Sequence, residues 1–169
     1  MTAEEFNALF RAHLGDVSRF LSRRLPAEAV EDIASDLFEI AWKKRASIPE
    51  GLELPWLYKS ARYLISNHLR KQSGRQSILD RFLEPQVAPS AESIALADAE
   101  LSEAWAKLPV ADAEVLSLWA MEGLEPTQIA AALGVSANAV NVRLSRAKKK
   151  LAAELEKNQE PNKKEILFK

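Results

Sequence analysis

The chain of 169 residues contains no cysteine and only two histidines, His13 and His68. The lack of cysteine excludes disulfides, thiolate metal sites and cysteine nucleophiles. Because each histidine stands far from the other, we expect no metal site and no cofactor. The sequence also lacks a Ser/His/Asp or paired-carboxylate arrangement with a plausible pocket, so we expect no enzymatic activity.

Long apolar runs are absent as well. The longest stretch without Asp, Glu, Lys or Arg, Pro126 to Val142, includes Thr, Gln, Ser and two Asn, and it falls short of the roughly 20 apolar residues of a membrane span. The first residues, MTAEEFNALF, are acidic and do not resemble a signal peptide. We therefore expect no membrane span and a cytoplasmic location.

Apolar residues make up 47% of the chain, which is enough for a packed core. They recur at helical spacing, most clearly from Val30 to Trp42, and no segment predicts a strand. The expected fold class is all-α, with two small helical domains joined by a flexible linker. We expect an N-terminal domain over residues 1–73, a linker over 74–95, a C-terminal domain over 96–157 and a flexible tail over 158–169, because periodicity is lost after Gly74 and again near Lys157.

The net charge of −1 hides a strong segregation of charge along the chain. Residues 59–81 carry six basic residues and one acid, residues 84–103 carry five acids and no base, and residues 127–151 carry five bases and no acid. Two basic islands of this kind can bind a polyanion even when the whole chain is nearly neutral. The alternative for either island alone is a solvated helix face.

The segment EPTQIAAALGVSANAVNVRLSRAKKKL predicts two helices joined by a tight turn. Pro126 suits a first helical turn, Gly134 can adopt the left-handed conformation that ends a helix, and Ser136 is a good N-cap for the next. The second helix has an apolar back and a polar, basic front. This pattern is typical of a helix-turn-helix whose second helix enters a DNA major groove, although any pair of antiparallel helices shares the apolar part.

The same segment resembles the C-terminal region of bacterial sigma factors of the extracytoplasmic-function group. Leu108-Pro109 matches the end of the family's linker helix, and Gly123-Leu124 with Ile129-Ala130 matches its G-L-[ST]-x-x-E-I-A motif. The family's next motif, V-S-x-G-T-V-[KR]-S-R-[LIV]-x-R-A-[RK], is matched by Val135, Ser136, Val140, Arg143, Leu144, Arg146, Ala147 and Lys148. Gln128, Asn138-Ala139 and Asn141-Val142 depart from the family pattern and leave the promoter sequence open.

The N-terminal half resembles the same family independently. AVEDIASDLFEIAWKK is similar to the sigma helix that docks on the clamp of RNA polymerase, and PWLYKSARYLISNHLRK is similar to the helix that engages the minus-10 promoter element. Between them, SIPEGLELP stands where the family keeps a loop that captures an extruded base. Ser35, Tyr63 and Asn67 replace the usual Gln, Asn and Asp.

The resemblance implies a promoter-recognition subunit of bacterial RNA polymerase that binds the core enzyme, recognises the minus-10 and minus-35 elements and assists promoter melting. It implies that the minus-35 element is contacted by Ser136, Asn138, Asn141, Val142, Arg143, Ser145, Arg146 and Lys149. For the minus-10 element it implies Lys59, Arg62, Tyr63, Asn67, Arg70 and Lys71, and for the core polymerase Asp32, Asp36 and Glu39.

The implied partners are the clamp coiled-coil of the largest polymerase subunit and promoter DNA, both as duplex and as non-template single strand. Family members are often silenced by an anti-sigma factor, although no residue of this sequence indicates one. We expect Trp42, Trp56 and Leu57 in the core. The alternative function is a stand-alone helix-turn-helix regulator that binds operators without polymerase, but such a protein has no need of the N-terminal motifs.

Overall fold

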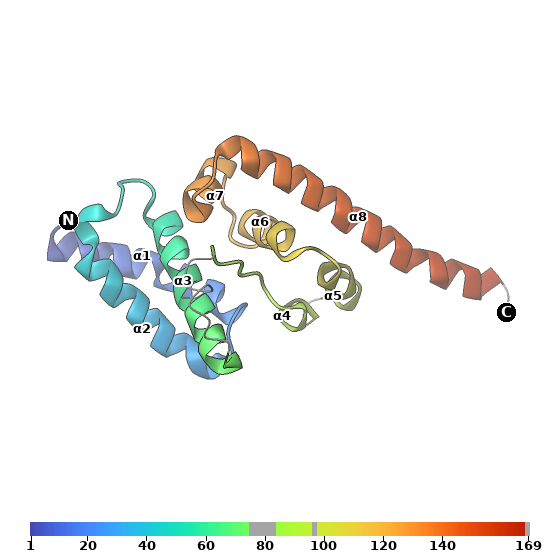
Figure 1. Ribbon diagram of the computed structural model, residues 1–169, viewed down its shortest axis with the longest axis horizontal. Coiled ribbons are helices and arrows are strands. Elements are labelled where there is room, and N and C mark those ends of the chain that lie inside the picture. Colours follow the sequence, from blue (N-terminus) through green and yellow to red (C-terminus); the bar gives the residue numbers. More distant parts are fainter. Residues whose placement is uncertain (75–83, 96–97, 168–169) are drawn as a thin grey trace.

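The computed structural model describes residues 1–74, 84–95 and 98–167, with side chains as far as Gln159. Figure 1 shows the helices, which are α1 (Ala3–Ser22), α2 (Ala27–Lys43), the short 3-10 helix η1 (Arg45–Ser47), α3 (Glu53–Ser73), α4 (Ala91–Ala95), α5 (Ala99–Ala106), α6 (Val110–Ala120), α7 (Pro126–Leu133) and α8 (Ala137–Leu167). No strand occurs in these parts of the chain. The predicted all-α class is confirmed.

Helices α1, α2 and α3 pack against one another as the N-terminal domain. Thr2 and Glu5 form a reciprocal capping box that starts α1, and the helix runs on through Gly15 without a break. Inside the bundle, the rings of Phe20 and Tyr58 stack with centroids 4.4 Å apart. Leu57 is fully buried, as predicted.

The two tryptophans of this domain differ from the prediction. Trp56 is only partly buried, and Trp42 is 38% exposed, so the prediction of a core Trp42 is wrong. Trp42 lies in the last turns of α2, where its ring and that of Phe6 form an edge-to-face pair with centroids 5.1 Å apart. The Arg45 guanidinium lies over the Trp42 ring, 4.0 Å from its centre. Helical periodicity places it on the correct side of the helix, but the bundle ends before it can enclose the ring.

Helices α5, α6, α7 and α8 pack together as the C-terminal domain, in which α7, the turn at Gly134 and α8 form the helix-turn-helix. Gly134 ends α7 with a φ of 68°, in the left-handed region that favours glycine. The Ser136 Oγ accepts a hydrogen bond of 3.1 Å from the Ala139 amide, which is the expected N-cap of α8. Buried Ile129 and Val140 hold the two helices together. The turn signals therefore act as the sequence predicts.

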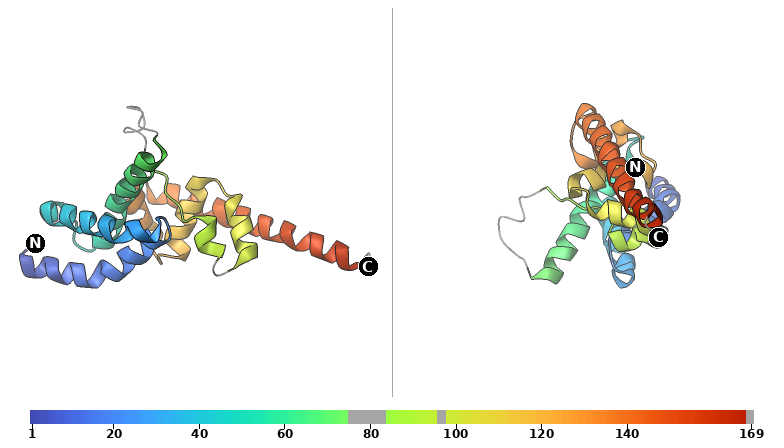
Figure 2. Two further views of the ribbon diagram at one scale, coloured as in Figure 1. Left: turned by 90° about the horizontal axis from the view of Figure 1, so that it is seen from below. Right: turned by 90° about the vertical axis from the view of Figure 1, so that its right-hand side faces the viewer.

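Two segments differ from the predicted organisation. Helix α4 lies inside the predicted linker, and α8 continues to Leu167, past the predicted start of a flexible tail at residue 158. Figure 2 shows this long helix projecting away from the other elements. As far as Lys157 this continuation follows from strong helix formers after Leu151 and from a 3.0 Å hydrogen bond between Lys157 and Glu154. Residues 75–83 of the predicted linker lie outside the described residues.

The two domains lie in contact rather than apart. Helix α3 packs directly against α7, as Figure 1 also shows, and buried residues of both domains form one continuous cluster. The sequence predicts two domains but contains no signal for this interface.

Leu118 tests the packing of the C-terminal core, since its side chain in α6 is completely buried. Replacing it by alanine (Leu118→Ala) leaves a cavity, and we expect the free energy of unfolding to fall by about 2–5 kcal/mol in urea titrations. Val142→Ala is the matched control, because Val142 is 57% exposed, and its effect should stay within about 0.5 kcal/mol. Equal losses in both variants would contradict this packing.

Candidate functional site

Helix α8 presents its polar, basic face to solvent. Val140, Leu144 and Ala147 are buried against the rest of the domain. The predicted minus-35 contacts on the other side are all accessible, with Arg143 partly exposed and Ser136, Asn138, Asn141, Val142, Ser145, Arg146 and Lys149 exposed. The first two turns of the helix therefore offer amides and a guanidinium to a major groove, as a recognition helix requires.

A buried carboxylate lies beneath this face. Asp112, at the start of α6, is 1% exposed, and it accepts hydrogen bonds from Arg146 Nη2 at 3.1 Å and from Lys150 Nζ at 2.9 Å. Burial by itself raises the pKa of the Asp112 carboxyl, but the bonds from Lys150 and Arg146 outweigh it, so the pKa lies below its ordinary value. Asp112 thus fixes two cations of α8 in place, and the sequence analysis missed it.

Lys148 is held on another side of the same helix. Its Nζ atom lies 3.6 Å from the centre of the Trp119 ring, which is a cation–π contact. Trp119 itself remains 41% exposed. The basic residues of α8 are therefore divided between the exposed front and contacts with α6.

Helix α3 carries the predicted minus-10 contacts, and most of them are accessible. Lys59, Tyr63, Asn67 and Lys71 are exposed and Arg70 is partly exposed. The Tyr63 hydroxyl donates to Glu84 Oε2 at 3.1 Å, and the pKa of Tyr63 is raised by burial and by this carboxylate. Arg70 donates to Asn67 Oδ1.

Arg62 is the exception among the predicted minus-10 contacts. Only 4% of the residue is exposed. Its guanidinium forms a two-pronged ion pair with Glu114 of α6 and also donates to the backbone oxygens of Pro85 and Ala132. In this conformation Arg62 is not available to DNA, which corrects the expectation of an exposed contact. The reason is tertiary, because the partner lies in the other domain.

The pair is almost wholly desolvated. Burial raises the pKa of Glu114 above its ordinary value, although Arg62 and the Val87 backbone act in the opposite direction. Removing one member of such a pair leaves an uncompensated buried charge, which is far more destabilising than replacing both members by apolar residues of similar volume.

A second charged cluster joins the domains, and the sequence analysis did not find it. Glu122, after α6, accepts from Arg23 at 2.8 Å and from Arg24 at 3.2 Å, and the Tyr58 hydroxyl lies 3.4 Å from its other oxygen. Arg24 also donates to Ser117 Oγ at 3.0 Å. Burial lowers the pKa of Arg24 to about 10 while Glu122 counteracts it, so Arg24 stays protonated at neutral pH.

Helix α2 presents the predicted acidic face. Asp32, Asp36 and Glu39 are all exposed. Glu39 pairs with Lys43 one turn later, and the hydrogen bond from Lys43 lowers the pKa of Glu39. Asp32 and Asp36 remain as two carboxylates one helical turn apart. They border a shallow hollow that Lys71 of α3 also lines.

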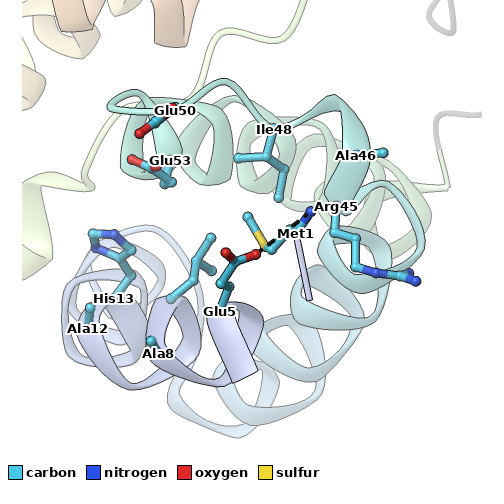
Figure 3. A pocket seen from close by; sticks show the side chains of 11 residues that line it. Met1, Glu5, Ala8, Ala12, His13, Arg45, Ala46, Ile48, Glu50 and Glu53 are labelled. Atoms are coloured by element: carbon cyan, nitrogen blue, oxygen red, sulfur yellow. Dashed lines mark ion pairs between the residues drawn. The ribbon is translucent and has the colours of Figure 1, made fainter. Parts of the chain in front are cut away.

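A larger hollow of about 580 Å³ lies between α1 and the loop that follows η1. Figure 3 shows Glu5 and His13 on the α1 side and Ile48, Glu50 and Glu53 on the loop side. The dashed line there joins the N-terminal amino group to Glu5 Oε2 at 3.9 Å. The lining is richer in carboxylates than in cations, so it does not favour a phosphate.

The described residues contain no cluster of three or more His, Cys, Asp or Glu side chains that could hold a metal ion. None of their helices is long and apolar enough to cross a membrane.

Both halves of the chain match known protein families. Residues 9–75 match the family described as sigma-70 region 2, and residues 98–151 match the one described as sigma-70 region 4. The chain belongs to the sigma-70 family. The predicted resemblance to its extracytoplasmic-function type is thereby confirmed, with regions 2 and 4 in the expected order.

Individual relatives agree with this membership. The probable RNA polymerase sigma factor RfaY of Xanthomonas campestris pv. campestris is 32% identical over 136 residues, which are 75% of this chain and 34% of that protein. The chain thus spans about a third of the length of this curated relative.

Solved structures resemble the whole fold. CnrH, in complex with the cytosolic domain of CnrY, is 26% identical with a TM-score of 0.64, over 92% of this chain and 90% of that chain. The sigma factor RpoE from Bartonella quintana, in complex with the anti-sigma factor NepR, is 23% identical with a TM-score of 0.64, over 91% and 98% of the two chains. The latter likeness concerns the fold alone.

The low pKa of Asp112 makes the stability of region 4 depend on pH. A carboxyl whose pKa is lowered by folding stabilises the folded state at pH values above its ordinary pKa. This contribution is lost as the pH falls through the pKa of the folded state. We expect Asp112→Asn to lower the free energy of unfolding by about 1–3 kcal/mol at neutral pH. The difference in free energy of unfolding between the variant and the parent chain should become smaller below about pH 4. Urea titrations at both pH values measure this. The exposed control Glu156→Gln should match the parent chain, and a gap independent of pH would contradict the ionic role.

Proposed function

We propose that this chain is a promoter-recognition subunit of bacterial RNA polymerase, without catalytic activity of its own, that works in the cytoplasm. It binds the core enzyme, recognises the minus-10 and minus-35 elements and assists promoter melting. The observation that carries this proposal is the presence of regions 2 and 4 in one chain. Each region has a basic helix with accessible side chains, and region 2 also has a separate acidic face on α2.

Region 4 reads the minus-35 element in this proposal. Base edges can form hydrogen bonds with the exposed amides of Asn138 and Asn141 and with the guanidinium of Arg143. Lys149, further along α8, reaches phosphates. Arg146 is positioned by Asp112, so it approaches the backbone from a restrained position rather than as a free side chain.

Region 2 acts on the minus-10 element. Separating DNA strands requires cations for phosphates and surfaces that hold unstacked bases, and α3 offers Lys59 and Lys71 beside exposed Tyr63 and Asn67. The sequence contains no G-x-x-x-x-G-K-[ST] motif for ATP. Binding energy is therefore the source of melting.

The alternative, a stand-alone operator-binding regulator, uses only region 4. The match of residues 9–75 to region 2 favours the polymerase subunit over this alternative. As a regulatory partner we propose an anti-sigma protein, by analogy with the sigma factor RpoE, whose structure was solved in complex with the anti-sigma factor NepR.

Transcription in vitro with core polymerase on a genomic DNA library tests the function directly. We expect the chain to direct initiation at a set of start sites that share two upstream elements, which sequencing of the transcripts reveals. If the chain failed to co-purify with core polymerase and bound operators tightly by itself, the alternative function would replace the proposal.

The acidic face of α2 should carry polymerase docking. Reversing its charge with Asp32→Lys and Asp36→Lys removes the complementarity with a basic partner surface, and we expect affinity for core polymerase to fall by about tenfold or more. Competition binding with labelled chain measures this loss. Glu4→Lys together with Glu156→Lys, exposed on α1 and α8, changes the net charge by the same amount and should bind core normally. Similar losses in both double variants would show that docking does not depend on this face.

Residues of α8 should separate into base readers and phosphate contacts. Lys149→Ala should weaken all promoters about equally and reduce the slope of log affinity against log salt by about one. Asn141→Ala should instead alter the preference among minus-35 sequences by about 1–3 kcal/mol per affected base pair. Binding of the polymerase holoenzyme to a promoter set at several salt concentrations distinguishes them, and each variant serves as the control for the other.

A further inference from the structure

A buried carboxylate of α6 holds two cations of α8 whose side chains remain half exposed. The Asp112 side chain is only 2% exposed, whereas the side chains of Arg146 and Lys150 that bond to it are 53% and 44% exposed. Helix α6 packs against α8, as Figure 1 also shows, and its central residues are buried. The anchor of both cations therefore belongs to the core of the domain.

Both cations keep hydrogen-bond donors for a second partner while Asp112 holds them. Arg146 donates through Nη2 to Asp112 Oδ1, and Lys150 donates through Nζ to Oδ2, so each carboxylate oxygen takes one cation. A guanidinium has five N–H donors and an ammonium group has three. The remaining donors can bind phosphate oxygens without breaking the bonds to Asp112.

The held cations lie further along α8 than its exposed amides. Asn138 and Asn141 lie in the first two turns of the helix, which begins at Ala137. Arg146 and Lys150 follow one turn apart, and four residues of helix span ~6 Å. In a recognition helix the N-terminal residues contact base edges, which leaves the later turns beside the DNA backbone. Base readers and held cations are thus parts of one rigid helix.

We propose that Asp112 is a positioning residue that determines the specificity of region 4 for the minus-35 element. This inference rests on the proposed function and deepens it. Because Asp112 fixes Arg146 and Lys150, their donors reach phosphates only when α8 lies in the register that also brings its amides to base edges. Phosphate contacts, which carry no sequence information by themselves, are thereby coupled to the reading of bases.

The charge of Asp112 acts in the same direction as its geometry. Its carboxylate compensates one of the two positive charges of Arg146 and Lys150. Non-specific DNA binding is almost wholly electrostatic, so two released cations would strengthen it by following the phosphates of any sequence. The specific complex already makes both contacts, and it would gain little while losing the preorganisation of two long side chains.

Binding of the polymerase holoenzyme to two DNA duplexes tests this inference. One duplex carries a promoter found by transcription in vitro, and the other differs only in a scrambled minus-35 element. Asp112→Asn removes the charge and keeps the shape of the side chain, and Asp112→Glu keeps the charge. Glu156→Gln is the matched control, because it removes one negative charge from an exposed position of α8.

We expect Asp112→Asn to raise the affinity for the scrambled duplex and to lower the discrimination between the two duplexes by about fivefold or more. The slope of log affinity against log salt should steepen by about one to two on the scrambled duplex alone, because the released cations displace counterions there. Asp112→Glu should keep more of the discrimination than Asp112→Asn does. Glu156→Gln should match the parent chain.

Equal changes in both affinities, or a lower discrimination without a steeper slope, would show that Asp112 only stabilises region 4 and would overturn the inference. If Asp112→Asn loses helical circular dichroism, a triple variant with Arg146→Gln and Lys150→Gln replaces it, since no buried charge then lacks a partner. The triple variant should lose affinity for the promoter duplex alone. An equal loss on both duplexes would again overturn the inference.

Failure of the proposed function gives a different result. If the parent chain initiates transcription while Asp112→Asn leaves the discrimination unchanged, the function stands and the inference is removed. If the parent chain never initiates with core polymerase, the proposed function is removed. The same two affinities then decide the inference for the free chain, measured on an operator selected from the genomic DNA library and on a scrambled copy of it.

Discussion

The ion pair between Arg62 and Glu114 is the contact on which the arrangement of this molecule depends. It joins α3 to α6 at a place with almost no solvent, and the same guanidinium binds the backbone of the connecting segment and of α7. A buried charge requires a complete set of partners. The packing of the two domains is therefore specified by polar geometry as well as by the apolar cluster that continues between them.

This constraint divides the charged surfaces into two classes. The acidic face of α2 and the polar, basic face of α8 are exposed, so both are accessible to partners in the conformation observed. The basic side of region 2 is partly engaged by region 4 through Arg24 and Arg62. A chain of nearly zero net charge thus carries one acidic and two basic surfaces, and part of the basic charge of region 2 is neutralised within the molecule.

Residue patterns predicted much of the fold because they reflect interactions between residues that are close together in the sequence. The glycine at 134 and the N-cap at Ser136 act within a few residues of themselves, so the turn between α7 and α8 follows from the sequence. Periodicity also predicted that Leu57 is buried. The same reasoning failed for Trp42, since periodicity gives the side of a helix but not where the neighbouring helices end.

The sequence by itself determined the helices other than α4 and the end of α8, and it also determined the helix-turn-helix and the family. Each of these depends on residues within one or two helical turns or on ordered motifs. Only the tertiary structure decided which charges meet. Arg62 and Glu114 are 52 positions apart, and Arg24 and Glu122 are 98 apart. Ion pairs between residues so far apart in the chain produce no periodic pattern in the sequence. Their interaction energy arises only when folding brings the two domains together and removes water from between them.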